Sequence, residues 1–309
     1  MSLRKRALLL RILLMALSGR KFFEARYGSF GVELVDVKPK QCIRLNSLKD
    51  VDVLSRLRTL GVRLESVSFL DNGFYVLESG FSLGAITEFL LGYYCIQSAP
   101  AQLPVKVLSP SPGDVVLDMC AAPGGKSTQL AELMENKGLL VCFELKPHRL
   151  SSLVYNLDRC GVVNSVVFRG DSVYAGKLGL KFDKILLDAP CSGNYVSDSH
   201  WFEKRDLDGI KKSSRIQKRL IRAASQFLKK DGVLVYSTCS LDPLENEFNV
   251  QWALDNLPLK LEDTGLDVGD PGLTEVFNEK FSSEIKKCRR FIPHKTGTEA
   301  FFIARFRRC

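Results

Sequence analysis

The sequence predicts an α/β protein in which a doubly covered parallel sheet follows a smaller N-terminal α/β domain. From residue 113 onward, short apolar strands alternate with helical segments, and parallel strands require such helical crossovers. A proline-rich stretch over 96–112 divides this alternation from a differently patterned start, which predicts a separate domain. The chain has 309 residues, of which 45% are hydrophobic, so it is long enough for two cores.

Residues 1–30 are predicted to be helical. Their apolar run follows Arg4-Lys5-Arg6 and ends near Gly19, an arrangement that imitates a signal peptide. Arg11 interrupts the run, and apolar residues recur at helical spacing at Leu8, Ile12 and Met15. A basic amphipathic helix is therefore favoured over a signal peptide. No other segment approaches the roughly 20 apolar residues of a membrane span, so we expect no membrane partner.

The N-terminal domain is predicted to end at residue 95 and to combine short strands with one helix. The helix is predicted over 48–60, and Asp71-Asn72-Gly73 is typical of a hairpin turn. The predicted strands cover 31–37, 42–45, 67–70 and 74–77. Residues 96–112 contain four prolines and are predicted to be a linker.

The second domain is predicted over 113–309. Its predicted strands cover 114–119, 139–144, 165–169, 182–187 and 233–237, completed by late strands near 259–261 and 300–306. Its predicted helices cover 126–136, 147–160 and 209–229. Asp242 and Glu245 match the N-cap and N3 positions of a further helix that would begin at Pro243. In such sheets, ligands bind beyond the carboxyl ends of the strands.

The net charge of +9 is concentrated at the two ends of the chain. Residues 1–50 contain 11 basic and 4 acidic side chains, and residues 281–309 contain 8 and 2, whereas the middle is slightly acidic. A further basic run covers 204–222. Basic ends indicate a polyanionic partner, most simply nucleic acid, although a basic surface that serves only solubility stays an alternative.

The nine cysteines form an odd set without a CxxC pair, and only three histidines accompany them. This pattern fits neither a zinc site nor a disulfide framework. We therefore expect reduced thiols in the cytoplasm and no bound metal.

The turn after the first strand of the sheet, 118–128, is rich in small residues. Its glycines allow a ligand to approach the backbone, and the following helix offers free N–H groups. A Walker A loop would need glycine where Cys120 stands, but with a Walker B-like strand over 184–188 a P-loop ATPase stays an alternative. Glu144, 20 residues after Gly124, instead matches the acid that binds ribose hydroxyls in nucleoside sites.

The next three strands also end in polar groups at this edge. Asp171 follows the third strand, Asp188 and Cys191 follow the fourth, and Cys239 follows the fifth. An isolated cysteine is usually a small buried apolar residue, but these two lie in polar turns where an apolar filler has no role. A thiolate near a helix N-terminus is stabilised and nucleophilic. We therefore expect two thiols and one carboxylate to converge on the ligand.

Three motifs in combination resemble the Sun/Fmu family of RNA (cytosine-5)-methyltransferases. They are the glycine-containing turn 118–126, the Asp-Ala-Pro-Cys-Ser-Gly segment 188–193 and the Ser-Thr-Cys-Ser segment 237–240. The resemblance covers about residues 40–305 and includes 44–49 in the first domain and Pro293-His294 near the end. Residues 98–101 and 297–301 depart locally from the family pattern.

The resemblance implies a Rossmann-like S-adenosylmethionine-dependent methyltransferase sheet and an N-terminal domain that recognises RNA. It implies S-adenosylmethionine as the cofactor and a target cytosine that is flipped out or already unpaired. The residues that it assigns to the cofactor are Cys120, Ala121, Ala122, Pro123, Gly124, Gly125, Lys126, Glu144 at the ribose, Arg149, Asp171 at the adenine, and Asp188.

Catalytic roles follow from the same resemblance. Cys239 is expected to be the nucleophile that adds to C6 of cytosine, Cys191 to assist its release, and Asp188 to hold the N3/N4 edge of the base. Lys126 is either a hydrogen-bond donor in the catalytic site or a contact to an RNA phosphate. The compact chain resembles the archaeal tRNA-modifying members of the family more than the ribosomal ones, so we expect a monomer that methylates tRNA. Ribosomal RNA is the alternative substrate, and a non-catalytic RNA-binding protein is an alternative of a different class.

Overall fold

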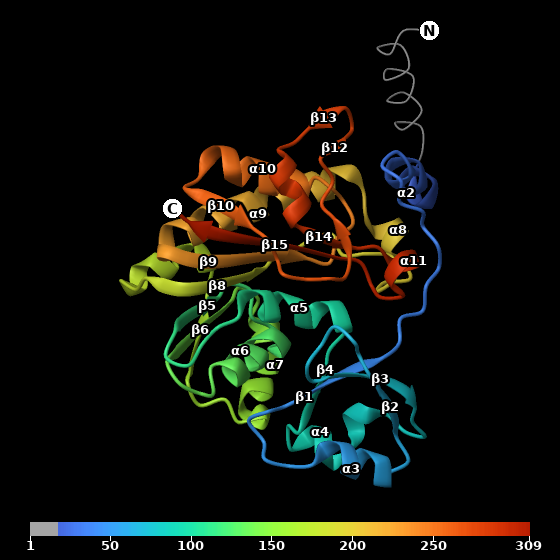
Figure 1. Ribbon diagram of the computed structural model, residues 1–309, viewed down its shortest axis with the longest axis vertical. Helices are drawn as coiled ribbons and strands as arrows, with labels where there is room; N and C mark the ends of the chain where they lie inside the picture. The colour runs from blue at the N-terminus through green and yellow to red at the C-terminus, as the bar shows by residue number, and fades with distance from the viewer. Residues whose placement is uncertain (1–17) are drawn as a thin grey trace.

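The computed structural model describes residues 18–309, which form two sheets and the helices around them (Figure 1). Most of the predicted N-terminal helix, with its apolar run, lies outside the described residues; its last part is α2 (Gly19–Gly28). α2 packs against α8 (Trp201–Lys204), where the ring centroids of Phe23 and Trp201 lie 4.4 Å apart. Within residues 18–309, no helix has the length and the apolarity that crossing a membrane requires.

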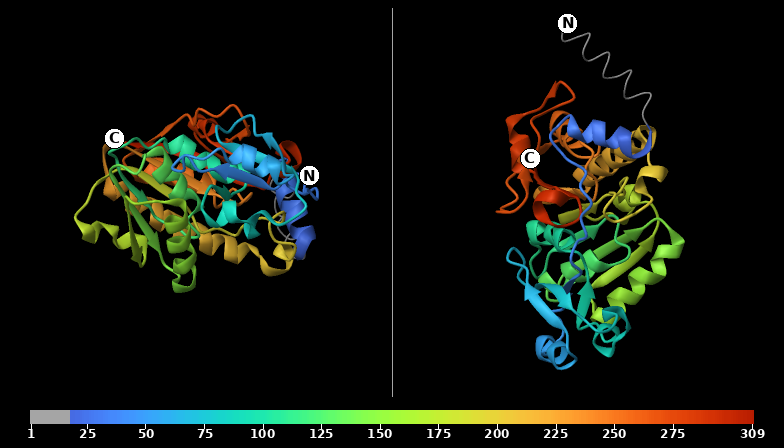
Figure 2. Two further views of the ribbon diagram at one scale, coloured as in Figure 1. Left: turned by 90° about the horizontal axis from the view of Figure 1, so that it is seen from below. Right: turned by 90° about the vertical axis from the view of Figure 1, so that its right-hand side faces the viewer.

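After α2, the chain runs in an extended segment to a small antiparallel sheet with the strand order β2-β3-β1-β4 (Figures 1 and 2). Its strands are β1 (Cys42–Leu45), β2 (Arg63–Ser66), β3 (Gly73–Glu78) and β4 (Tyr94–Ile96). Its helices are α3 (Val53–Thr59), η1 (Leu83–Ala85) and α4 (Thr87–Leu90). β1 and β3 confirm the strands predicted at 42–45 and 74–77, and the helix predicted over 48–60 is shorter at both ends.

Two strand predictions in this part are wrong. The segment 31–37 is extended but belongs to no strand, and its apolar alternation arises because Val32 and Leu34 are buried with the aromatic residues of α2. The segment 67–70 is instead part of the connection between β2 and β3. Val67 is buried there by the neighbouring core and not by strand pairing.

The segment predicted as a linker contains the helix α5 (Ala99–Leu108), most of which is buried. Pro100 occupies the start of the helix, where the missing N–H removes no intrahelical bond. Pro110 and Pro112 follow its end, where proline commonly terminates helices. α5 packs against β8, β9 and β15, so it is part of the core under the larger sheet and not a flexible connection.

The larger sheet has the strand order β11-β14-β15-β9-β8-β5-β6-β7, with β10 paired to β15. Its parallel strands are β5 (Val115–Asp118), β6 (Leu139–Glu144), β7 (Ser165–Arg169), β8 (Phe182–Asp188) and β9 (Leu228–Thr238). The remaining strands are β10 (Leu259–Glu262), β11 (Asp270–Pro271), β14 (Arg289–Phe291) and β15 (Phe301–Arg308). β15 runs antiparallel to β9, so the sheet is mixed and not parallel throughout as predicted. Antiparallel neighbours need no crossover helix, and residues 239–300 connect these two strands.

Helices cover both faces of the larger sheet (Figure 1). On one face lie α5, α6 (Gly125–Leu133) and α7 (Pro147–Cys160). On the other face lie η2 (Ser172–Leu178), α9 (Leu207–Phe227), α10 (Glu247–Asn256) and η3 (Ser283–Lys287). The short helix α11 (Pro293–Thr296) and the hairpin of β12 (Glu275–Val276) and β13 (Glu279–Lys280) complete the described elements.

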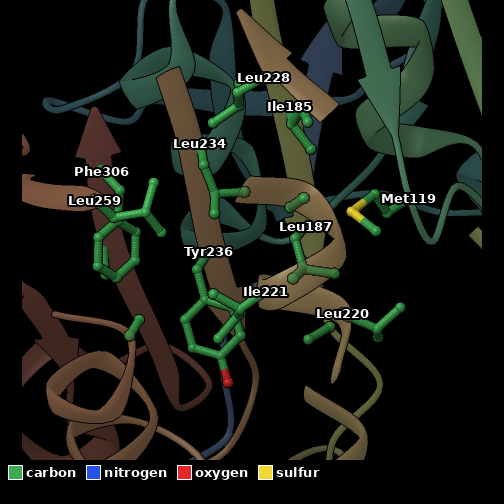
Figure 3. Close-up of a cluster of buried hydrophobic side chains, with 14 of the residues drawn as sticks. Met119, Ile185, Leu187, Leu220, Ile221, Leu228, Leu234, Tyr236, Leu259 and Phe306 are labelled. Carbon is green, nitrogen blue, oxygen red and sulfur yellow. The ribbon is translucent and has the colours of Figure 1, made fainter. Parts of the chain in front are cut away.

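Each strand of the larger sheet contributes alternate side chains to the two cores. Val116, for example, faces α5 and α6, whereas Leu117 faces α9. Figure 3 shows the core on the α9 face, where Leu234 and Tyr236 of β9 pack near Ile221. Burying one such aliphatic side chain stabilises the fold by about 1.5–3 kcal/mol. The two cores hold the parallel strands in register, and thereby fix the edge at which their carboxyl ends meet.

The helix predicted to begin at Pro243 begins four residues later, at Glu247. Arg26 of α2 binds the Asp242 carboxylate through two hydrogen bonds of 2.6 and 2.9 Å, and the Asp242 Oδ1 also accepts a 3.0 Å hydrogen bond from the Leu244 N–H. The carboxylate of Glu245 accepts hydrogen bonds from the loops after β8 and β9. Residues 243–246 therefore form a turn that joins the end of β9 to α10.

Candidate active site

The carboxyl ends of the parallel strands bring the predicted site segments to one edge of the sheet. β5 ends at Asp118 between β6 and β8, and β8 pairs with β9 so that Asp188 lies opposite Ser237. The turn after β5, the loop after β8 and the loop after β9 are therefore adjacent. The predicted convergence of two thiols, one carboxylate and the glycine-containing turn is what the strand order produces.

The thiols of Cys191 and Cys239 lie next to each other, with a distance of 3.1 Å between their Sγ atoms. This distance is well beyond the roughly 2.05 Å of a disulfide, so both are free thiols in hydrogen-bond contact. The hydrogen bond with Cys239, burial and the charge of Cys239 all raise the pKa of Cys191 well above its usual value. The raised pKa favours the protonated form of Cys191, and the geometry allows either sulfur to donate the hydrogen bond.

Asp188 is held in place by partners on both of its oxygens. Its Oδ2 accepts a hydrogen bond of 2.8 Å from Lys126 Nζ, and its Oδ1 accepts one of 2.7 Å from the Ser237 hydroxyl. The Asp188 side chain is nevertheless 30% exposed, so one edge of the carboxylate remains open. Burial lowers the pKa of Lys126, but the charge and the hydrogen bond of Asp188 outweigh burial and raise it. The Lys126 ammonium also lies over the Phe301 ring, 5.4 Å from its centroid.

The turn after β5 has the close packing expected of a backbone that cradles a ligand. Gly124 adopts a φ of 107°, and a Cβ at this position would lie 3.2 Å from atoms of Leu153 and Asn156, so only glycine fits without strain. Helix α6 begins at the next residue, Gly125, so its first N–H groups have no partner within the helix. Such a helix start favours polar or anionic ligand groups.

The two acids predicted to bind the cofactor follow successive strands beside this turn. Glu144, at the end of β6, is buried; its carboxylate accepts a 2.7 Å hydrogen bond from the Lys146 N–H and lies 3.6 Å from Arg149. Asp171, after β7, accepts a 2.7 Å hydrogen bond from Arg219. A buried carboxylate with a single close hydrogen bond retains acceptor capacity, which fits the predicted role of Glu144 at hydroxyl groups. Arg149 also donates to the carbonyl of Ala122, which joins α7 to the turn.

Several polar residues at this site were not predicted from the sequence. Ser237 supports Asp188, and Asn194 donates a 3.0 Å hydrogen bond to the carbonyl of Cys239. Further polar residues surround the two cysteine loops at Ser192, Gln217, Ser240 and Glu245. For Ser192 and Ser240, the sequence offered one signal: each serine directly follows one of the two site cysteines.

The two segments that depart from the family pattern, 98–101 and 297–301, contact each other. The hydroxyl of Ser98 donates a hydrogen bond to the carboxylate of Glu299. The second carboxylate oxygen of Glu299 accepts a 2.9 Å hydrogen bond from Ser197, in the loop after β8. The departures therefore lie together at the side of the site and leave the cysteine pair and the Asp188–Lys126 pair intact.

Cys120 lies in the turn after β5, whereas three other cysteines lie in the core away from the site edge. Cys42, Cys142 and Cys160 are buried as predicted, and burial is the main reason that the pKa of Cys42 is raised to about 11. Within residues 18–309, no three Cys, His, Asp or Glu side chains form a group that could hold a metal ion.

Residues 105–307 match the family model described as 16S rRNA methyltransferase RsmB/F. The chain is 39% identical over 272 residues to the tRNA (cytosine(49)-C(5))-methyltransferase of Pyrococcus abyssi, a match that covers 86% of this chain and 87% of that protein. It is 36% identical over 286 residues to the human 28S rRNA (cytosine(4447)-C(5))-methyltransferase. That match covers 90% of this chain but 35% of the human protein, so the chain spans about a third of its length.

A solved structure has the same architecture. The structure of NSun6 from Pyrococcus horikoshii with SFG superposes with a TM-score of 0.79 at 27% sequence identity, covering 97% of each chain. The predicted class, a Rossmann-like methyltransferase sheet with a smaller N-terminal α/β part, is confirmed. The resemblance to the Sun/Fmu family is confirmed as well, and these relatives support a methyltransferase over a P-loop ATPase.

Proposed function

Because this chain belongs to the 16S rRNA methyltransferase RsmB/F family, we propose that it methylates C5 of a cytosine in RNA, and specifically in tRNA. The observation that carries the proposal is the pair of thiols 3.1 Å apart beside the Asp188–Lys126 pair. The tRNA assignment is supported by the Pyrococcus abyssi relative, most of whose length this chain covers.

The proposed cofactor is S-adenosylmethionine, which supplies an electrophilic methyl group on a sulfonium sulfur. Its support is the fit of the turn after β5, where Gly124 leaves room at the backbone and α6 presents its first N–H groups. Glu144 would bind the ribose hydroxyls, Asp171 the adenine, and Arg149 would hold the turn from α7. SFG, with which the NSun6 structure was solved, is an analogue of this cofactor.

Cys239 would start the reaction by adding to the base. C5 of cytosine is a weak nucleophile. Once the Cys239 thiol has given its proton to solvent water, a bond from its Sγ to C6 places the electron pair of the C5=C6 bond on C5 and N3. Asp188 faces the N3/N4 edge and stabilises the proton that N3 takes up. Lys126 and Ser237 orient Asp188 for this contact, which favours the catalytic-site role of Lys126 over a contact to an RNA phosphate.

Cys191 would assist the release of the product. After methyl transfer, C5 carries both a methyl group and a hydrogen, and solvent water takes that hydrogen as a proton. The C–H electron pair then re-forms the C5=C6 bond, the C6–S bond breaks, and its pair returns to Cys239 as a thiolate, while N3 returns its proton to solvent water. The protonated Cys191, 3.1 Å away, donates a hydrogen bond that stabilises the departing thiolate.

The target base reaches this site only when it is out of a helical stack. The surrounding basic surface would then hold the flanking phosphates, which the charge of the chain ends and of α9 supports. We further propose a monomer that acts in the cytoplasm, where the nine free cysteines are stable as thiols.

Two cysteine variants test the proposed reaction with a tRNA substrate and S-adenosylmethionine carrying a labelled methyl group. Cys239→Ala is expected to lower methyl transfer by at least about 10³-fold, because the covalent step is lost. Cys191→Ala is expected to accumulate a protein–RNA adduct that survives a denaturing gel. Cofactor affinity, measured by calorimetry, should stay unchanged in both variants.

Retained activity in Cys239→Ala would move the nucleophile elsewhere, with Cys191 the first candidate. Absence of the adduct in Cys191→Ala would remove that residue from the release step. Binding of ATP without binding of S-adenosylmethionine would end the proposal. Bisulfite sequencing of total RNA from a strain that lacks the protein separates tRNA from ribosomal RNA as the substrate.

A further inference from the structure

Glu245 lies in the turn between β9 and α10, and its side chain is fully buried. Its Oε1 accepts hydrogen bonds from the Ser192 backbone N–H at 2.9 Å and from the Gln217 amide at 3.0 Å. Its Oε2 accepts hydrogen bonds from the hydroxyls of Ser192 and Ser240, each at 2.5 Å. Because an ionised carboxylate has about four acceptor sites, these donors use all of them.

The donors come from the two loops that carry the thiols. Ser192 directly follows Cys191 in the loop after β8, and Ser240 directly follows Cys239 in the loop after β9. One carboxylate therefore binds both loops at the residue next to each cysteine. Gln217 of α9 adds a third attachment, because its amide also donates a 2.9 Å hydrogen bond to the carbonyl of Pro190, just before Cys191.

We infer that Glu245 is a positioning residue that fixes the separation of the Cys191 and Cys239 thiols by holding both of their loops. A role as the N3 residue of a helix cap does not explain this arrangement, because α10 begins after it, at Glu247. Among residues 18–309, none of the donors to its carboxylate is a lysine or an arginine, so within this part of the chain neutral donors alone stabilise the buried charge. Such a charge is costly, and an apolar residue would serve a purely structural turn better.

Two further polar contacts join the loop after β8 to the loop after β9. Asn194 donates a 3.0 Å hydrogen bond to the Cys239 carbonyl, and the Ser192 and Ser240 hydroxyls lie 3.2 Å apart. Without Glu245, those hydroxyls lose their common acceptor, and the loops are free to move apart. The charge of Glu245 also contributes to the raised pKa of Cys191, after the hydrogen bond with Cys239, burial and the charge of Cys239.

The consequence for the reaction rests on the proposed function. Cys191 stabilises the departing Cys239 thiolate only while the two sulfur atoms are in hydrogen-bond contact. Loss of Glu245 should therefore slow release more than it slows addition, since addition does not require Cys191.

The separation of the thiols is measured without any substrate by their rate of oxidation to a disulfide. Diamide accepts two electrons and two protons from a pair of close thiols, and the linked Cys191–Cys239 peptide is quantified by mass spectrometry. Glu245→Ala is expected to lower the rate of this cross-link at least about tenfold. Glu245→Gln is expected to stay within about threefold of wild type, because the serine hydroxyls can rotate to accept from the new amide.

Glu247→Gln is the matched control, since Glu247 is also buried but binds Arg290 and neither cysteine loop. A cross-linking rate at the wild-type level in Glu245→Ala would overturn the inference. So would a rate in Glu247→Gln that falls as far as that of Glu245→Ala. If Glu245→Ala does not fold, Ser240→Ala takes its place, with an expected fall of about threefold and an unchanged rate as the contrary result.

A second experiment, with RNA substrate, measures the fraction of protein that is trapped as a covalent protein–RNA adduct. Glu245→Ala is expected to raise this fraction when Cys191 is present and to leave it unchanged in a Cys191→Ala background, because both changes disable the same step. If wild-type protein is active and the adduct fraction of Glu245→Ala equals that of wild type, the role of Glu245 in release is overturned. Wild-type protein that methylates no RNA would end the proposed function, whereas the cross-linking rates would still decide on Glu245.

Discussion

At the scale of single residues, the site depends on carboxylates that are buried to different degrees. Asp188 is partly exposed and paired with Lys126, whereas Asp118, 1% exposed, lies behind the cofactor turn. The carboxylate of Asp118 accepts hydrogen bonds from the Ser127 hydroxyl at 2.7 Å and from the Cys120 N–H at 3.3 Å. Burial outweighs these bonds and raises the pKa of Asp118 to about 6.

The raised pKa of Asp118 gives a pH dependence of stability. The folded state keeps the proton up to about pH 6, whereas the unfolded chain loses it near pH 4, so the stabilisation is complete below pH 4 and is lost as the pH rises to about 6. Relative to Asp118→Asn, wild-type protein should lose about 2 kcal/mol of unfolding free energy between pH 4 and pH 7. Urea unfolding at several pH values measures the difference.

Comparison with the variant separates the effect of Asp118 on stability from the effects of the other buried acids, such as Glu132. The pKa of Glu132, raised to about 7 mainly by burial, changes the stability of both proteins equally and cancels. Parallel pH profiles of the two proteins would contradict the assignment to Asp118.

At the scale of elements, α9 has one buried face and one basic face. Its buried residues pack on the larger sheet, whereas the exposed side chains that recur along the opposite face are mostly cationic: Lys211, Lys212, Arg215, Arg219 and Arg222. The helix also reaches the active site, because Gln217 binds the carbonyl of Pro190. A basic face that starts beside the Cys191 loop is suited to the phosphates that flank a bound base.

Reversal of charge on α9 tests this contact. Lys212→Glu combined with Arg215→Glu should weaken RNA binding by about tenfold or more at low salt, and reduce the salt dependence by about one unit of slope for each lost phosphate contact. Cofactor affinity should not change. Filter binding over a series of salt concentrations gives both quantities.

The matched control carries the same change of net charge elsewhere. Lys230 and Lys260 are exposed, near the amino end of β9 and on β10, so Lys230→Glu with Lys260→Glu should affect RNA binding much less. Equal losses in the two double variants would indicate a general charge effect and not a contact along α9.

Local patterns predicted the elements of the larger sheet better than those of the smaller one. β6, α7 and β7 begin and end where predicted, because continuous apolar strands between helices leave little ambiguity. The segment 31–37 resembles a strand because its buried residues alternate, but what buries them is α2, far from any sheet partner. Burial by the preceding helix and burial by strand pairing leave the same pattern in the sequence.

Some residues of the candidate site could be predicted from the sequence, and others could not. Asp188, Cys191 and Cys239 could be predicted, because each lies in a distinctive short segment at the end of a strand. Glu245 could not, since its partner Ser192 lies 53 residues away and its own surroundings matched a helix cap. The geometry that joins two loops is set by the packing of β8 against β9, which no local spacing specifies.

At the scale of the whole molecule, one buried arginine joins the two sheets. Arg44 of β1 is 2% exposed and binds Glu132 of α6 at 2.8 Å and the carbonyl of Gly125 at 2.7 Å. It also donates to the hydroxyl of Thr128 and to the amide oxygen of Gln97. The smaller sheet is thereby attached to the helix that begins at the proposed cofactor turn.

Removal of Arg44 should therefore destabilise the whole chain. Arg44→Met leaves the buried Glu132 carboxylate without its cation and should cost about 3–5 kcal/mol of unfolding free energy, measured in urea. Removing both charges, with Arg44→Met and Glu132→Gln together, should restore part of that loss.

An exposed ion pair serves as the control for the loss of unfolding free energy in Arg44→Met. The side chains of Arg63 and Glu78 are 69% and 64% exposed, so Arg63→Met should cost less than about 1 kcal/mol. A loss in Arg44→Met no larger than that in Arg63→Met would show that the buried pair does not join the two sheets energetically.

The path of the chain gives the smaller sheet two covalent attachments to one body. α2 packs on α8 before the chain leaves for β1, and α5 packs on β8, β9 and β15 directly after β4 (Figure 1). A unit tethered at both ends gains less conformational entropy when it opens than a unit tethered at one. Partial unfolding of the smaller sheet therefore leaves a closed loop whose ends stay fixed, and this restriction favours its re-formation in the same place.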